Sequence, residues 1–189
     1  MTGPDMRRIL LIAVAVLLAG CAAAPAGSNK LSTAPTTVTA GTPRSSASVG
    51  PSDSAKMICD LEVRSQVSAI LHLSDLPPTT SSWADHVYTC VYHLAAGPLT
   101  LSVQEPADTS SAGAYFNASR QHLAANRQLS GLGQLAYAAP TGSVVVLKDN
   151  KTLRIDVTAL PSQVGRPPVL RTDLASELAV AIMGCWTGA

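Results

Sequence analysis

The sequence has few aromatic residues and few charges. It contains one Phe, two Trp and four Tyr among 189 residues, and charged side chains make up 13% of it. Ala, Val and Leu must therefore fill whatever core the chain forms. The formal net charge of +1 gives no basic excess of the kind that nucleic acid or anionic lipid attracts, so we expect no nucleic-acid partner.

The apolar run near the N-terminus is too short to cross a bilayer. Ile9–Gly20 has 12 residues, whereas a transmembrane helix needs about 20. Arg7 and Arg8 precede the run, and small or aliphatic residues end it before Cys21. This arrangement is typical of a signal peptide, which we place at residues 1–20.

The last residues of this segment predict a lipid anchor. Leu18-Ala19-Gly20-Cys21 matches the bacterial lipobox. The match implies a diacylglycerol on the Cys21 sulfur, cleavage before Cys21, and acylation of the new amino group, commonly by palmitate. Two or more chains anchor stably where one holds only marginally. We therefore expect a protein on the outer face of the cell membrane; the alternative is an ordinary secretory signal with an incidental cysteine.

A linker and one domain follow the cleavage site. Of the 34 residues in 22–55, 27 are Ala, Gly, Ser, Thr or Pro and none is aromatic. Such a segment cannot bury enough apolar surface to offset its ordering entropy, so 21–55 is predicted to be the lipidated cysteine and a disordered linker. Its composition also suits O-glycosylation. Residues 56–189 are predicted to form a single domain.

Periodicity predicts an α+β fold for this domain. Helical spacing marks Asp60–His72, Ser110–Asn126 and a final segment that carries Leu170, Leu174, Leu178 and Ile182. Alternation marks the strands, which are HVYTCVYHL, LTLSVQ, QLAYA, SVVVLK and TLRIDVT, and the DN before the last strand suits a tight turn. We expect two layers: an antiparallel sheet of about five strands with three helices packed on one face, in the order αββαβββα.

Three cysteines remain once Cys21 carries lipid, and thiols outside the cytoplasm tend to oxidise. We favour a Cys59–Cys90 disulfide, because Cys59 begins the first helix and Cys90 lies on the inward face of the adjoining strand. Cys185 falls on the apolar stripe of the last helix, which predicts a buried, inert thiol. A bond from Cys185 to Cys59, or between two chains, stays open.

The sequence contains no recognised catalytic or metal motif. Gly131–Ala136 (GLGQLA) fits a relaxed dinucleotide fingerprint, but a strand follows instead of a helix, so a turn is favoured. The four histidines lack HExxH spacing and CxxC is absent, so we expect no metal and no cofactor. There is no GxSxG elbow, and the neighbours Asp85 and His86 are interpreted as coincidental. An enzyme is not expected.

Two proline-rich loops are candidate contact surfaces. Residues 76–83 carry Trp83 and residues 164–170 carry Arg166, and aromatic and arginine side chains often anchor interfaces. The interpretation that we prefer places Trp83 over the edge of the core and Arg166 in solvent.

The order of these segments resembles a known family. The lipobox, the Ser/Thr/Pro-rich tether, ICDLEVRSQVSAIL, YTCVYHL and LSGLGQLAYAAPTGSVVVLKDNKTLRIDVTA are similar to small actinobacterial, often mycobacterial, cell-envelope lipoproteins of unknown function. The resemblance implies a lipid-anchored α+β domain with one early disulfide, and Cys185 is not part of its pattern. It supplies no catalytic residues.

These observations leave two function hypotheses. The first is a noncatalytic binding or accessory module that contacts an envelope protein or a small apolar ligand. The alternative is a secreted hydrolase with an unrecognised active site. A concave pocket lined by apolar residues would favour binding, whereas convergent His, Asp and Ser would favour catalysis.

Overall fold

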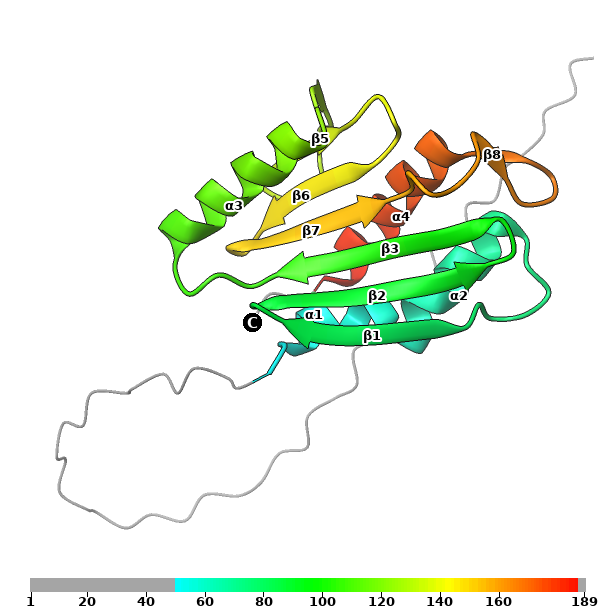
Figure 1. The fold of residues 1–189 in the computed structure, drawn as a ribbon, viewed down its shortest axis with the longest axis horizontal. Coiled ribbons are helices and arrows are strands. Elements are labelled where there is room, and N and C mark those ends of the chain that lie inside the picture. Colours follow the sequence, from blue (N-terminus) through cyan, green and yellow to red (C-terminus); the bar gives the residue numbers. More distant parts are fainter. Residues whose placement is uncertain (1–49, 187–189) are drawn as a thin grey trace, which may run out of the picture. The chain divides into compact units, whose positions relative to one another are not determined.

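Seven strands form one antiparallel sheet in the computed structural model, which describes residues 50–186 (Figure 1). The strands lie side by side in the order β1-β2-β3-β7-β6-β5-β4, and β8 and β9 form a separate two-stranded ribbon. The α+β class and the antiparallel sheet are as the periodicity predicted. The predicted lipid anchor, signal peptide and most of the predicted linker, Cys21 included, lie outside the described residues.

Helices and strands alternate in groups along the chain. The elements are α1 (Asp53–Lys56), the 3-10 helix η1 (Met57–Cys59), α2 (Leu61–Leu71), β1 (Thr79–Ala84), β2 (Val87–Leu94), β3 (Gly97–Gln104), α3 (Thr109–His122), β4 (Arg127–Gln128), β5 (Leu135–Ala138), β6 (Val144–Lys148), β7 (Lys151–Asp156), β8 (Gln163–Val164), β9 (Val169–Leu170) and α4 (Arg171–Cys185). Within residues 50–186, no helix combines the length and apolar content that crossing a bilayer requires.

One face of the sheet supplies the main core. Alternate residues of the strands point to this face, as predicted for sheets with one buried side. The fully or almost fully buried ones are Cys90, Tyr92, Leu99, Leu101, Val103, Ala136, Ala138, Val144, Val146, Leu153 and Ile155. Helices α2 and α4 pack on this face through Val63, Val67, Leu174, Leu178 and Ile182.

Helix α3 lies on the opposite face of the sheet, which corrects the prediction of three helices on one face. Phe116 and Leu123 pack with Val145, whose neighbours on β6 point to the main core. The guanidinium carbon of Arg120 lies 4.3 Å from the ring centroid of Tyr137 on β5. The physical reason is that β6 is apolar on both sides, so its second face also needs a cover.

The sheet is wider than the predicted five strands. Residues 79–84, most of which fall in the loop predicted at 76–83, form β1 and pair with β2. Strand β4 adds a short strand at the other edge. Asp85 and His86 are the two turn residues of the β1–β2 hairpin, with φ of 50° and 60°. The two-residue ribbon strands β8 and β9 were also missed, and Leu170 is exposed in β9 rather than on the stripe of α4. These strands are too short or too polar to show an alternating pattern.

The ordered domain begins earlier than residue 56. Asp53–Lys56 form α1, and Ser54 and Ala55 are buried. The Ser and Ala content of these residues favours a linker, but it fits the start of a helix equally well because Ser52 caps it. Within the described residues, regular structure therefore starts at α1, three residues before the predicted start of the domain.

Two turn predictions are confirmed. Asp149 and Asn150 have φ of 50° and 58° between β6 and β7, as a two-residue hairpin turn of the primed type requires. Gly131 and Gly133 both have positive φ ahead of β5, and a Cβ on Gly133 would lie 2.5 Å from the Leu147 carbonyl oxygen. GLGQLA is thus a turn that needs glycine.

Candidate functional site

A largely apolar cavity of about 480 Å³ opens at the end of α2, where the β2–β3 hairpin and the β8–β9 ribbon meet it. We call it the α2-end cavity. Its lining residues come from three segments distant in sequence: Leu71, His72, Leu73, Ser74, Leu94, Ala95, Ala96, Val164, Gly165 and Arg166. In Figure 1, the end of α2, the β2–β3 turn and the ribbon labelled β8 lie at the same end of the domain.

The inner wall of this cavity is built by the core itself. Leu71 and Val164 are buried members of the main core, and Leu73 and Leu94 are partly buried and pack against it. Ala95 and Ala96 are exposed in the β2–β3 turn and form the outer edge. The cavity is therefore an apolar indentation of the core surface, of a volume typical for small-molecule sites.

Close backbone contact fixes the ribbon against α2. Gly165 has φ of +82°, and a Cβ there would lie 2.9 Å from the Leu71 carbonyl oxygen. The base of the ribbon is held by Arg171, whose Nη1 donates to the Leu160 carbonyl oxygen at 2.7 Å and whose backbone N–H donates to that of Ser162 at 3.1 Å. These contacts set the position of the cavity wall that carries Val164.

The rim is polar. His72 ends α2 in the left-handed conformation, and backbone bonds from His72 and Leu73 satisfy the carbonyls of Ala69 and Ser68. The side chains of His72 and Arg166 are exposed, and neither makes a hydrogen bond or ion pair with another residue of the described chain. Arg166 was predicted to be solvated, which is confirmed.

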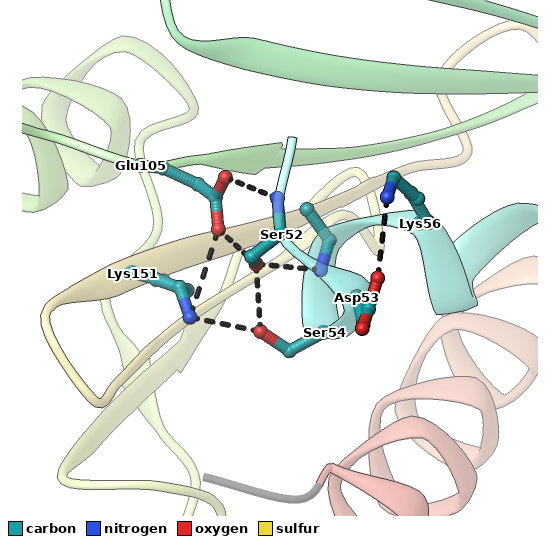
Figure 2. Close-up of polar contacts among 7 residues, drawn as sticks. Ser52, Asp53, Ser54, Lys56, Glu105 and Lys151 are labelled. Carbon is teal, nitrogen blue, oxygen red and sulfur yellow. Dashed lines mark hydrogen bonds and ion pairs between the residues drawn. The ribbon is translucent and has the colours of Figure 1, made fainter. Parts of the chain in front are cut away.

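A polar cluster lies at the opposite end of β3. We call Ser52, Ser54, Glu105 and Lys151 the Glu105 cluster (Figure 2). Ser52 N–H donates to Glu105 Oε2 at 2.9 Å and the Ser52 hydroxyl to Oε1. Lys151 Nζ donates to Ser54 Oγ at 2.8 Å and lies 3.6 Å from Glu105 Oε1.

Serine next to lysine and glutamate is also a combination used in nucleophilic catalysis. Here each group already has a structural partner: Ser52 caps α1, and the mostly buried charges of Glu105 and Lys151 compensate each other. Neither of the cavities described here is lined by these residues. The cluster is suited to holding α1 on the sheet.

The histidines do not gather into a site within residues 50–186. His93 is exposed, as predicted, and its Nε2 lies 3.1 Å from Thr80 Oγ1. The His86 ring meets the Trp83 ring edge to face at 6.0 Å between centroids, and Trp83 is half-buried beside Tyr88 on β2. In this range no group of three or more His, Cys, Asp or Glu could hold a metal ion.

Cys59 and Cys90 form the predicted disulfide between η1 and β2. Cys185, predicted to be buried, is only half-buried near the end of α4, where its Sγ lies 3.3 Å from Glu62 Oε1. Cys185 lies between the core residues Ile182 and Trp186, on a side of the last turn of α4 that faces Glu62 of α2 and is partly exposed.

Two ionisable groups next to the core have shifted pKa values. Burial raises the pKa of the Tyr92 phenol, and the Arg64 guanidinium offsets part of the rise. The Tyr92 hydroxyl donates to the Ile58 carbonyl oxygen, which ties η1 to β2. Burial alone would raise the pKa of Asp156, but hydrogen bonds from Thr158 and the Arg154 guanidinium outweigh it, so this pKa is lowered.

A second, more open cavity of about 400 Å³ lies between α2 and α4. Its lining residues are Gln66, Ile70, Ser176, Glu177, Val180 and Ala181. It mixes polar and apolar side chains of two helices and has no core residue as its floor. The α2-end cavity is the better candidate for a ligand.

Sequence analysis did not identify the α2-end cavity. Its walls come from residues 71–74, 94–96 and 164–166, and their proximity depends on the fold. The signal that could have pointed to it was the glycine of VGRPP, at a position where the backbone approaches another segment. Comparisons with protein-family models, curated proteins and solved structures give no match to this chain.

Proposed function

We propose that this protein is a lipid-anchored, extracytoplasmic module of the cell envelope that binds a small apolar ligand without chemically altering it. The anchor is the lipid on Cys21, and the binding site is the α2-end cavity. The ligand buries its apolar part against Leu71, Leu94 and Val164. The protein thus holds an apolar molecule at the membrane surface.

The observation that carries this proposal is the apolar lining of the cavity. Six of its ten lining residues are Leu, Val or Ala, and two of these belong to the buried core. Water in such a place makes few hydrogen bonds, and an apolar ligand that displaces it gains roughly 25 cal/mol per Å² of buried apolar surface. The lining includes no carboxylate.

The sequence supports lipid attachment at Cys21, and the disulfide is compatible with it. The lipobox ends at Cys21, and the segment up to residue 51 has a composition that favours a flexible tether. A structural disulfide such as Cys59–Cys90 is typical of proteins outside the reducing cytoplasm.

Binding of N-phenyl-1-naphthylamine, an apolar probe whose fluorescence rises out of water, tests the proposal. The full chain with Cys21→Ala needs no detergent and should bind the probe. Ala95→Trp in this background should reduce the fluorescence increase, because the indole would fill the mouth of the cavity. Ala118→Trp, on an exposed position of α3, is the matched control and should bind normally.

The proposal fails if the parent chain gives no saturable fluorescence increase. It also fails if Ala95→Trp binds the probe as tightly as Ala118→Trp does, since the probe would then occupy another surface.

A further inference from the structure

The rim of the α2-end cavity carries one formal positive charge. Arg166 and His72 stand at its edge, whereas no acidic residue lines it. Asp75 follows the lining residue Ser74 and accepts a hydrogen bond from its Oγ at 2.8 Å, but is itself outside the lining. An anion at the rim would therefore meet a formal positive charge from Arg166 and no lining carboxylate to repel it.

The Arg166 side chain is available to a ligand. It is exposed, and it makes no hydrogen bond, ion pair or ring contact with any other residue among 50–186. Most of the other arginines of the domain have such partners: Arg64 with Pro77, Arg120 with Ala125, Arg154 with Asp156 and Arg171 with Leu160.

The backbone that carries Arg166 is held in place. Gly165 rests against the backbone of Leu71, and Val164 is buried in the main core. Arg166 therefore extends from a fixed point next to the cavity, so that ligand binding must order its side chain but not the loop. Less ordering entropy is lost than for an arginine on an unattached loop.

The chemistry of an arginine rim above an apolar floor defines a ligand class. A guanidinium binds carboxylates and phosphates through paired N–H donors. An alkyl chain below it would contact Leu71, Leu94 and Val164, and each methylene that leaves water strengthens binding about fourfold. Polar ligands gain nothing from this floor.

We infer that the α2-end cavity selects single-chain amphiphiles with an anionic head group, which Arg166 binds at the rim while the chain enters the cavity. This inference rests on the proposed function, since it names the ligand of the same site. Arg166 determines the specificity for the head group, and the apolar wall supplies most of the affinity.

Displacement of N-phenyl-1-naphthylamine from the Cys21→Ala chain by ligands of one chain length tests the inference. The ligands are dodecanoate, dodecyl phosphate, dodecan-1-ol and dodecyltrimethylammonium, each below its aggregation concentration. Dodecanoate, dodecyl phosphate or both should bind about fivefold more tightly than the alcohol. A fivefold gain in affinity is about the upper end of what an exposed ion pair contributes. The ammonium compound should bind more weakly than the alcohol.

Variants test whether Arg166 causes the preference for anionic head groups. Arg166→Gln should bind dodecan-1-ol as the parent does but bind the anions no better than the alcohol. Arg166→Lys keeps the charge and should retain most of the preference. Arg127→Gln, at an exposed arginine on β4, is the matched control and should leave the preference unchanged.

The outcomes separate the two proposals. Equal binding of anions and alcohol, tighter binding of the ammonium compound, or an anion preference that survives Arg166→Gln overturns the head-group inference while binding itself stands. If none of the four ligands displaces the probe, the proposed function fails with it.

Discussion

Thr152 on β7 has a buried hydroxyl without a hydrogen-bond partner among the described residues. The residue is 1% exposed. Its cross-strand partners are Gln104 on β3 and Leu147 on β6. Gln104 Oε1 and Arg154 Nε nearby are also buried without partners.

We therefore expect Thr152→Val to stabilise the protein. The substitution keeps the β-branched shape and removes a hydroxyl that was desolvated without compensation, so the free energy of unfolding should rise by about 1 kcal/mol. Urea unfolding measures the change. Thr158→Val is the control with the opposite sign, because the Thr158 hydroxyl donates to Asp156 Oδ1 at 2.6 Å. A loss of stability in Thr152→Val would contradict this account.

Asp156 makes the stability of the fold depend on pH. Its folded-state pKa is lowered, because hydrogen bonds from Thr158 and Arg154 outweigh its burial. The unfolded chain therefore binds the proton more readily. The stabilising contribution is complete above the ordinary aspartate pKa of about 4 and is lost as the pH falls below that value through the folded-state pKa.

Asp156→Asn should therefore lower the stability at pH 7 and flatten the decline of stability below pH 4. Thermal unfolding measured between pH 2.5 and pH 7 shows both effects. Asp149→Asn changes an exposed turn position that asparagine tolerates well and should keep the parent profile. An unchanged acid limb in Asp156→Asn would mean that other carboxylates dominate the pH dependence.

At the scale of elements, the disulfide joins η1 to the second strand across 31 positions of sequence. On the chain-entropy model, a loop of this size stabilises the fold by about 3 to 4 kcal/mol. The double variant Cys59→Ala/Cys90→Ala should lose that amount of unfolding free energy in urea. A reductant should lower the urea midpoint of the parent chain but not that of the double variant. Cys185→Ser serves as the control. A loss in Cys185→Ser as large as that in the double variant would indicate that Cys185 takes part in the bond.

The Glu105 cluster holds α1 to the sheet. Glu105→Gln removes the charge that compensates Lys151 and weakens the acceptor for Ser52, at a cost of about 2 kcal/mol. Amide hydrogen exchange of residues 53–57 should accelerate more than that of α4. Asp53→Asn disrupts an exposed pair with Lys56 and should have little effect. Protection of 53–57 that is unaffected by Glu105→Gln would show that burial of Ala55 alone holds α1.

The elements that sequence analysis found are those with strong periodic patterns. Leu99, Leu101 and Val103 alternate with polar residues, and Val63 and Val67 follow helical spacing, so local chemistry alone indicated β3 and α2. The polar residues 79–84 become a strand through pairing with β2, a tertiary effect. The placement of α3 depended on the second apolar face of β6, which a continuous run of Val leaves ambiguous.

The candidate site was less predictable for a geometric reason. Arg166 was singled out as a residue of a proline-rich loop, but nothing local placed it beside Leu71 and Leu94. Those residues were predicted as core, and only the folded chain leaves a cavity next to them. A pocket formed by three distant segments has no signature in any one of them.

At the scale of the whole molecule, the proposed anchor determines where the protein is located but not whether its domain folds. Cys21→Ala should move the protein from the membrane fraction to the soluble or secreted fraction, because the lipid chains supply the membrane affinity. Fractionation with immunoblotting measures this, and circular dichroism and the unfolding midpoint should stay unchanged. A variant that remains in the membrane fraction would refute lipid anchoring through Cys21.

Strand β3 connects the end of the domain with the Glu105 cluster to the end with the α2-end cavity. Glu105 follows its last residue, while Ala96 in the β2–β3 turn precedes its first, about 30 Å away at the usual rise per residue. Tension on the N-terminal segment would reach the sheet through Ser52 and Glu105 and pass along the strands. If residues before Ser52 act as the proposed tether, a force on them acts first on α1 and its hydrogen bonds to Glu105, at the other end of β3 from the cavity walls at Leu71 and Val164.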